Sequence, residues 1–91
     1  MEKVVILNAN KTKNGTVILH YGYQDSKEKY LKGFQICEQW INNSNLYDVL
    51  SDEAFGSVYD VEFGYEDTYN GNARRVINKL VDSDGQVLFE R

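Results

Sequence analysis

Residues 26–42, SKEKYLKGFQICEQWIN, decide the fold class, because this segment can form either a helix or a strand. At helical spacing four apolar side chains share one stripe, and Asp25 with Glu28 resembles a capping box. The stripe consists of Tyr30, Phe34, Cys37 and Ile41. As a strand, the segment places Tyr30, Phe34, Ile36 and Trp40 on one face and Leu31, Cys37 and Ile41 on the other. Gly33 and the β-prone Phe, Ile, Trp and Tyr residues favour the strand, whereas the periodicity alone favours the helix.

The rest of the chain predicts strands around one short helix. Apolar or alternating runs bounded by turn residues indicate strands at 2–9, 16–24, 57–65, 73–81 and 86–90. Residues 45–55 follow Ser44, which can cap a helix, and indicate a short helix. Along 16–24 the alternation places Val17, Leu19, Tyr21 and Tyr23 on one face and Thr16, Ile18, His20 and Gln24 on the other. Along 57–65 it turns Tyr59, Val61, Phe63 and Tyr65 inward.

With 26–42 taken as a strand, the element order is three strands, a short helix and two strands. This is the order of the OB-fold, a five-stranded Greek-key barrel that binds oligonucleotides. We therefore predict a mainly β single domain over residues 1–91, a five-stranded OB-like barrel whose helix lies between strands three and four. The alternative is an α+β fold, in which an antiparallel sheet carries a helix at 26–42.

Charge is unevenly spread along this acidic chain of 91 residues and net charge −4. Residues 1–33 carry six Lys against three acids, and residues 34–71 carry eight acids and no Lys or Arg. Such segregation predicts a basic surface and a separate acidic one. No signal peptide or 18-residue apolar run is visible, and the single cysteine, Cys37, fits a reducing compartment. We therefore expect a cytoplasmic protein with no membrane contact.

Signals for catalysis or for a bound metal are weak. His20 is the only histidine, it is distant in sequence from Cys37, and no third residue is placed to orient a Cys–His pair. Zinc would need several Cys and His ligands. The motif Asp82-x-Asp84-Gly85 lacks the later ligands of a calcium loop, and a hairpin turn explains it better. We expect no enzymatic activity and no cofactor.

Aromatic residues interleaved with basic ones are the positive signal. Seven Tyr, four Phe and one Trp make up 13% of the chain, more rings than so small a core hides easily. Exposed rings mark surfaces that bind protein partners or stacked bases. Cations beside such rings are what a single-stranded nucleic acid requires, because cations neutralise phosphates while rings stack on bases.

With the OB order, the tyrosine content, the segment YLKGFQICEQW (30–40) and the terminal strand ARRVINKLV (73–81), the chain resembles the small phage-type single-stranded DNA-binding proteins, including those of filamentous phages. The resemblance implies DNA binding through a β-barrel surface, without chemistry, in a protein encoded by a phage or mobile element. It places the binding residues at Lys11, Lys13, Tyr21, Tyr23, Tyr30, Lys32, Phe34, Tyr69, Arg74 and Arg75.

A second hypothesis is a small acidic inhibitor that imitates DNA and binds a basic DNA-binding protein, as anti-restriction and anti-CRISPR proteins do. Its surface would consist of Asp48, Asp52, Glu53, Asp60, Glu62, Glu66 and Asp67. The choice between DNA, RNA and a protein partner stays open from the sequence. So does a homodimer formed through an open sheet edge at 2–9 or 86–90.

Overall fold

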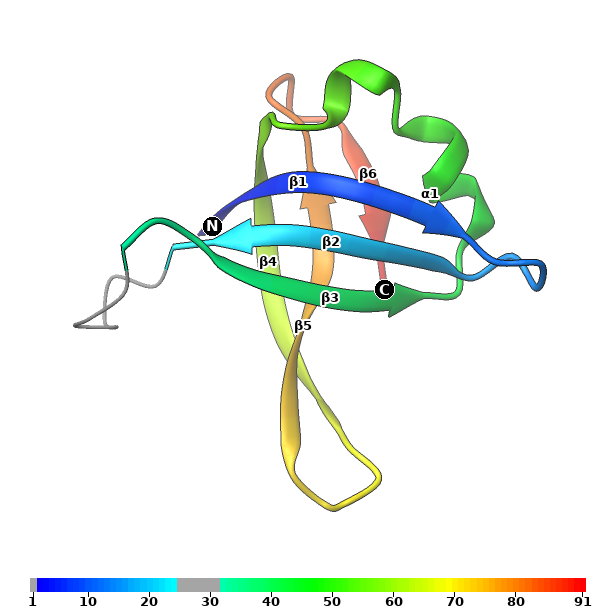
Figure 1. Ribbon diagram of the computed structural model, residues 1–91, viewed down its shortest axis with the longest axis vertical. Coiled ribbons are helices and arrows are strands. Elements are labelled where there is room, and N and C mark those ends of the chain that lie inside the picture. The colour runs from blue at the N-terminus through cyan, green and yellow to red at the C-terminus, as the bar shows by residue number, and fades with distance from the viewer. Residues whose placement is uncertain (1, 25–31) are drawn as a thin grey trace.

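The computed structural model describes residues 2–24 and 32–91, which form one antiparallel sheet and one short helix (Figure 1). The strands are β1 (Glu2–Lys11), β2 (Val17–Tyr23), β3 (Gln35–Ile41), β4 (Val58–Asp67), β5 (Ala73–Val81) and β6 (Val87–Glu90). They lie in the order β3-β2-β1-β4-β5-β6 across the sheet. The helix α1 (Ser44–Val49) and a single 3-10 turn (Asp52–Ala54) connect β3 to β4. The prediction of a mainly β fold with a short helix is therefore confirmed.

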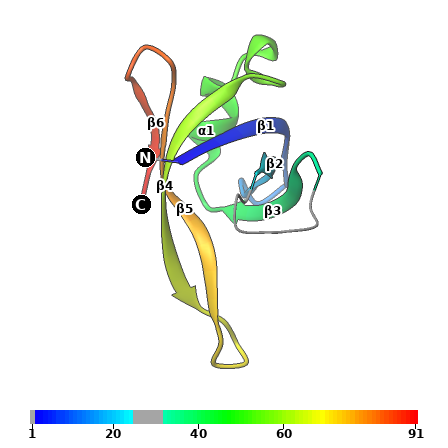
Figure 2. The same ribbon diagram turned by 90° about the vertical axis from the view of Figure 1, so that its left-hand side faces the viewer.

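The sheet bends so far that its two halves face each other, with β1-β2-β3 running across β4-β5-β6 (Figures 1 and 2). β1 joins the halves, because it pairs with β2 and its first residues also pair with Val58–Val61 of β4. Register shifts between Ile6 and Asn8 and between Glu62 and Phe63 interrupt the pairing, and such bulges increase the local bend. The bend creates the enclosed space in which the core forms.

The core lies between the two halves of the sheet. Its fully buried large side chains are Ile6, Leu19, Leu46, Ile77 and Leu80, joined by Val4, Val17, Val61 and Val76. A helix of six residues is not stable alone, so the burial of Leu46 is what holds α1 against β1, β2 and β6. The alternation expected along 16–24 is confirmed, since Val17, Leu19 and Tyr21 are buried and Tyr23 is half-buried on the inner side.

The segment that decides the fold class is a strand where it is described. Gln35–Ile41 pairs with β2 along its whole length, so a helix over these residues is wrong. Residues 25–31 of the expected strand lie outside the described residues, and 32–34 precede the strand as irregular chain. The β-prone residues of this segment therefore outweigh its helical periodicity, because pairing with β2 satisfies the main chain and alternation buries one side.

The helix expected over 45–55 is shorter than predicted. Asn43 caps α1, its side-chain oxygen accepting a hydrogen bond from the main-chain N–H of Asn45 at 3.1 Å. The chain becomes extended at Leu50, which closes the helix with its own N–H bonded to the Leu46 carbonyl. Both leucines are buried, so the early turn is what brings the second one back to the core.

The sheet is not closed into a five-stranded barrel. It has six strands, and among the described residues no main-chain pairing joins β3 to β5. The buried side chain of Gln39 crosses that opening instead. Its amide donates to the Ile77 carbonyl at 3.1 Å and accepts from the Ile77 N–H at 2.6 Å. One side chain thus provides the pair of hydrogen bonds that a neighbouring strand would supply.

Candidate functional site

The side of β1, β2 and β3 that points away from the core, here called the outer face, carries large exposed apolar side chains. Its residues include Val5, Asn8, Asn10, Ile18, His20, Gly22, Phe34, Ile36, Glu38 and Trp40. On β3 the alternation that buries Gln39 and Ile41 leaves Ile36 62% and Trp40 61% exposed. Phe34, just before the strand, is 51% exposed. Exposed apolar side chains gathered on one face are typical of a binding surface.

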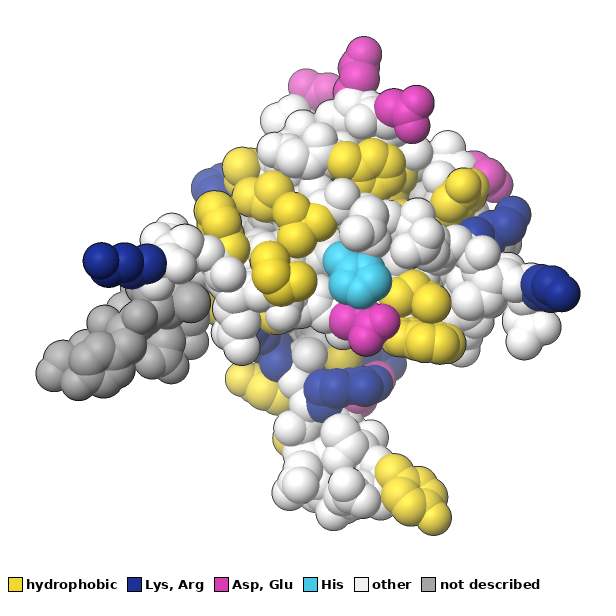
Figure 3. Space-filling model, viewed as in Figure 1, with side chains coloured by type: hydrophobic (Ala, Val, Ile, Leu, Met, Phe, Trp, Pro, Cys, Tyr) yellow, Lys and Arg dark blue, Asp and Glu magenta, His cyan; other side chains and the backbone are white. Residues whose placement is uncertain are grey.

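A row of polar side chains divides the outer face into two apolar parts. His20 lies opposite Asn8 of β1 on one side and Glu38 of β3 on the other. The His20 Nδ1 lies 2.8 Å from the Asn8 Oδ1, and its Nε2 lies 3.6 Å from the Glu38 Oε1. Figure 3 shows the histidine in cyan, with hydrophobic side chains on both sides of it.

Gly22 makes room for one of the exposed rings. A Cβ atom at Gly22 would lie 3.1 Å from the Cβ of Phe34, closer than side chains normally pack. The absence of a side chain therefore lets the Phe34 ring lie against β2. Together with Val5 and Val58, this ring also lines a shallow groove of about 420 Å³.

Arg75 is held between two rings at the start of the β4–β5 hairpin. Its guanidinium carbon lies 4.1 Å from the centre of the Tyr23 ring and 4.4 Å from that of Phe63. The two rings meet edge to face at 5.3 Å. These contacts fix the guanidinium by cation–π attraction, and no carboxylate pairs with it among the described residues. Its charge is thus available to an anion.

The other cations expected at the site have different surroundings. Lys13 and Lys32 are exposed, while Lys11 lies 5.5 Å from the centre of the Tyr47 ring. Arg74 forms an ion pair with Glu66, which also binds Arg91 at 2.9 Å. Hydrogen bonds from these two arginines hold the pKa of the Glu66 carboxyl below its usual range. Arg74 is therefore partly neutralised, unlike Arg75.

The predicted tyrosines are scattered rather than gathered at one surface. Tyr21 is 2% exposed and belongs to the core, so it is removed from the expected binding surface. Burial, together with the nearby Cys37 thiol, raises the pKa of Tyr21 to about 12. Tyr23 lies under Arg75, Tyr69 is fully exposed at the hairpin tip, and Tyr30 lies outside the described residues. Tyr21 and Tyr23 lie on the inner face of β2 because side chains alternate along a strand, and both are an even number of residues from buried Leu19.

Residues of the outer face were missing from the sequence-based site. Trp40, Ile36, His20 and Glu38 lie there, and the strand alternation of 35–41 already groups Phe34 with the first two. The expectation that Tyr65 points into the core is wrong, since its ring is 73% exposed. Tyr65 follows the inward parity of Phe63, but the hairpin extends beyond the opposite half of the sheet, so no strand of the described chain covers its ring (Figure 1).

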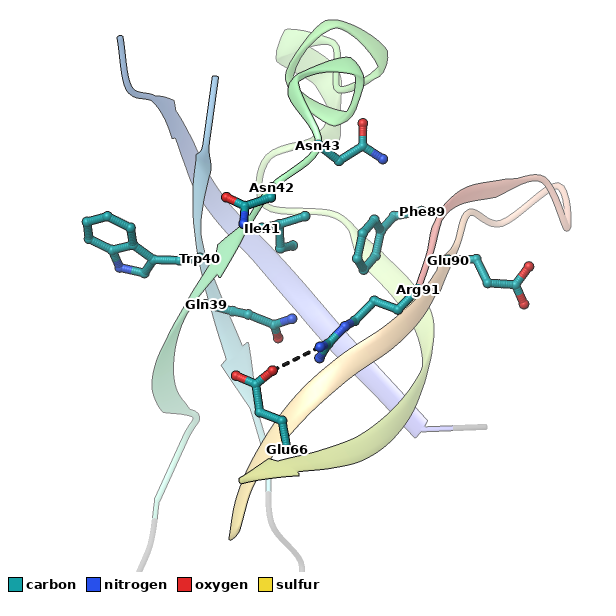
Figure 4. A pocket seen from close by; sticks show the side chains of 9 residues that line it. All are labelled: Gln39, Trp40, Ile41, Asn42, Asn43, Glu66, Phe89, Glu90 and Arg91. Carbon is teal, nitrogen blue, oxygen red and sulfur yellow. Dashed lines mark ion pairs between the residues drawn. The ribbon is translucent and has the colours of Figure 1, made fainter. Parts of the chain in front are cut away.

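A groove of about 510 Å³ follows the opening between β3 and β6 (Figure 4). Gln39, Trp40 and Ile41 line it from β3, and Phe89, Glu90 and Arg91 line it from the opposite side. Glu66 reaches into it and pairs with Arg91. The Trp40 ring points away from this groove, toward the outer face (Figure 4).

Some carboxylates of the predicted DNA-mimic surface form ion pairs with basic side chains. Asp60 pairs with Lys3 at 2.7 Å, and Glu66 pairs with two arginines. Asp48, Asp52 and Glu53 are exposed around α1 and the 3-10 turn, and Glu62 and Asp67 are exposed on β4. The exposed carboxylates thus divide between the helical connection and β4, and Figure 3 shows acidic side chains at the end of the molecule occupied by that connection in Figure 1.

Neither a metal cluster nor a membrane span is found in the described part of the chain. No three His, Cys, Asp or Glu side chains in residues 2–24 and 32–91 are grouped to hold a metal ion. No helix in these ranges is long and apolar enough to cross a membrane. No family model, curated protein or solved structure matches this chain.

Proposed function

We propose that this protein binds single-stranded nucleic acid on the outer face of β1-β2-β3, by base stacking and phosphate neutralisation and without making or breaking bonds. The observation that carries this proposal is the exposure of Phe34 and Trp40 on one side of β3. Bases can stack on exposed aromatic side chains whatever the nucleotide sequence, because every base has a π-face. The two apolar parts of the face offer two such platforms.

The distribution of cations supports the same surface. Lys13 lies in the turn between β1 and β2, and Lys32 precedes Phe34 at the other end of the sheet. Arg75 stacks on Tyr23, on the inner side of β2, and therefore lies apart from this face. Cations at the margins and rings between them are the arrangement that follows a phosphate backbone.

We further propose that the bent sheet is an open OB-like barrel. Three strands, a helix and two strands follow one another in the predicted order, and β6 extends the sheet beyond them. Gln39 bridges to Ile77 at the place where closure would pair β3 with β5. The outer faces of the second and third strands are the usual oligonucleotide surface of that fold.

Fluorescence anisotropy of a labelled oligo-dT at two salt concentrations, with duplex DNA as a control, tests the proposal. We expect the single strand to bind more tightly than the duplex. The log of the association constant should fall with log salt with a slope of roughly −2, if about three cations meet phosphates. Trp40→Ala and Phe34→Ala should each weaken binding by roughly 1–3 kcal/mol, as stacking losses do.

Tyr47→Ala is the matched control, because it removes an exposed ring from α1 on the acidic connection. Its effect on oligonucleotide affinity should be less than twofold. The proposal would be contradicted if no oligonucleotide bound at low salt, or if the association constant did not change with salt concentration. The exposed carboxylates of Asp48, Asp52 and Glu53 would then become the surface to test against basic protein partners.

A further inference from the structure

A carboxylate stands in the middle of the proposed binding face. Glu38 lies between Ile36 and Trp40 along β3, with about half of its side chain exposed (52%). A carboxylate repels phosphate, so a backbone passing directly over it would weaken binding. It also accepts hydrogen bonds and donates none when ionised. A bound strand must therefore present a base edge, rather than its phosphates, at this point.

His20 adds a second acceptor beside Glu38. The Asn8 Oδ1 can only accept, so its 2.8 Å contact places the imidazole proton on Nδ1 of His20. In the neutral tautomer the Nε2 carries a lone pair, and this atom lies 3.6 Å from the Glu38 Oε1. In that tautomer both atoms accept hydrogen bonds, and a ligand that carries two neighbouring donors can bind both.

We infer that Glu38 and His20 select guanine at the centre of the outer face. This inference rests on the proposed nucleic-acid function and names the base that the same site prefers. Among the common bases, guanine alone carries two neighbouring donors, N1–H and the N2 amino group, on its Watson–Crick edge. That edge matches a carboxylate and an adjacent ring nitrogen, and single-stranded bases expose it.

The neighbouring ring brings the base within reach. Trp40 and Glu38 are two residues apart on one side of a strand, a separation of about 7 Å. A base stacked on the Trp40 ring can therefore turn its edge toward the carboxylate. Ile18, opposite Trp40 on β2, gives that part of the face an apolar floor.

The test compares three labelled 11-mers of dT whose central base is thymine, guanine or hypoxanthine. Hypoxanthine keeps the N1–H of guanine and lacks the N2 amino group. We expect the guanine oligonucleotide to bind about tenfold more tightly than the all-thymine one, with hypoxanthine between them. Glu38→Gln should reduce the guanine preference below twofold and tighten binding of the all-thymine strand, because it removes a negative charge.

Glu62→Gln is the matched control, since it removes an exposed carboxylate from β4, outside the outer face. This variant should retain the full guanine preference. Equal affinities for guanine and thymine in the unchanged protein, or a preference that survives Glu38→Gln, would overturn the inference and leave the proposed function standing. Failure of all three oligonucleotides to bind at low salt would overturn both.

Discussion

The inner and outer sides of β2 and β3 consist of alternate residues of the same two strands, yet they have opposite properties. The inner side carries fully buried Leu19 and a Gln39 amide whose hydrogen bonds are both made inside the protein. The outer side carries exposed Trp40 and a His20–Glu38 pair whose facing atoms lie 3.6 Å apart. Parity along a strand therefore separates the side chains of the core from those of the proposed binding face. A substitution on one side should therefore change stability, and one on the other should change affinity.

The largest expected effect is that of a cavity on the inner side. Leu19→Ala should lower the free energy of unfolding by about 2–5 kcal/mol, because a fully buried leucine loses its contacts and leaves a void. Ile18→Ala, one residue along on the outer side, should lower it by about 1 kcal/mol or less. Urea denaturation followed by circular dichroism measures both. Equal losses at the two positions would show that the sides do not differ in the way described.

A smaller loss is expected where the inner side is polar. Gln39→Leu replaces the amide with an apolar side chain of similar volume. It leaves the buried N–H and carbonyl of Ile77 without the hydrogen bonds that Gln39 provides. We expect a loss of roughly 2–4 kcal/mol, since each unsatisfied buried group costs about 1–3 kcal/mol. The Ile77 amide should also exchange its hydrogen faster, as measured by NMR.

Gln35→Leu is the control for this change, because it alters an exposed glutamine at the other end of β3. It should leave both the stability and the Ile77 exchange rate close to those of the unchanged protein. If Gln39→Leu proved as stable as Gln35→Leu, the bridge between β3 and β5 would contribute nothing to closing the opening.

The smallest effect is confined to alkaline pH. Burial and the Cys37 thiol raise the pKa of Tyr21 to about 12, whereas the pKa of a tyrosine in the unfolded chain is about 10. The folded state therefore holds this proton more tightly, and stability present below pH 10 is lost as pH rises toward 12. Tyr21→Phe should lose less stability than the unchanged protein between pH 8 and 11 in urea denaturation. Tyr65→Phe, which alters an exposed ring, should follow the unchanged protein.

Several elements follow from local pattern alone. The alternation along 16–24 identified Val17, Leu19 and Tyr21 as one side of a strand, and all three are buried. The choice between helix and strand at 26–42 needed the neighbouring strands, because its helical stripe competed with its β-prone residues. The helix predicted to run to residue 55 ends at Val49, since the return of Leu50 to the core overrides local propensity.

The candidate site was predicted less well than the fold. Phe34 and Lys32, which border the proposed face, were among the predicted residues, and so was Tyr21, which is buried. Composition counts rings but does not say which side of a strand faces the core. The partial neutralisation of Arg74 by Glu66 likewise depends on a pairing across the β4–β5 hairpin.

Local sequence determined where strands form, the alternation of their side chains between two sides and the segregation of charge, because these depend on neighbours along the chain. The tertiary structure decided which parity faces the core, how far the sheet closes and which charges meet. Those outcomes depend on contacts between distant segments, such as Gln39 with Ile77 and Glu66 with Arg91. Alternation gives every strand two sides, and only the packing of one half of the sheet on the other leaves Trp40 and Glu38 in solvent.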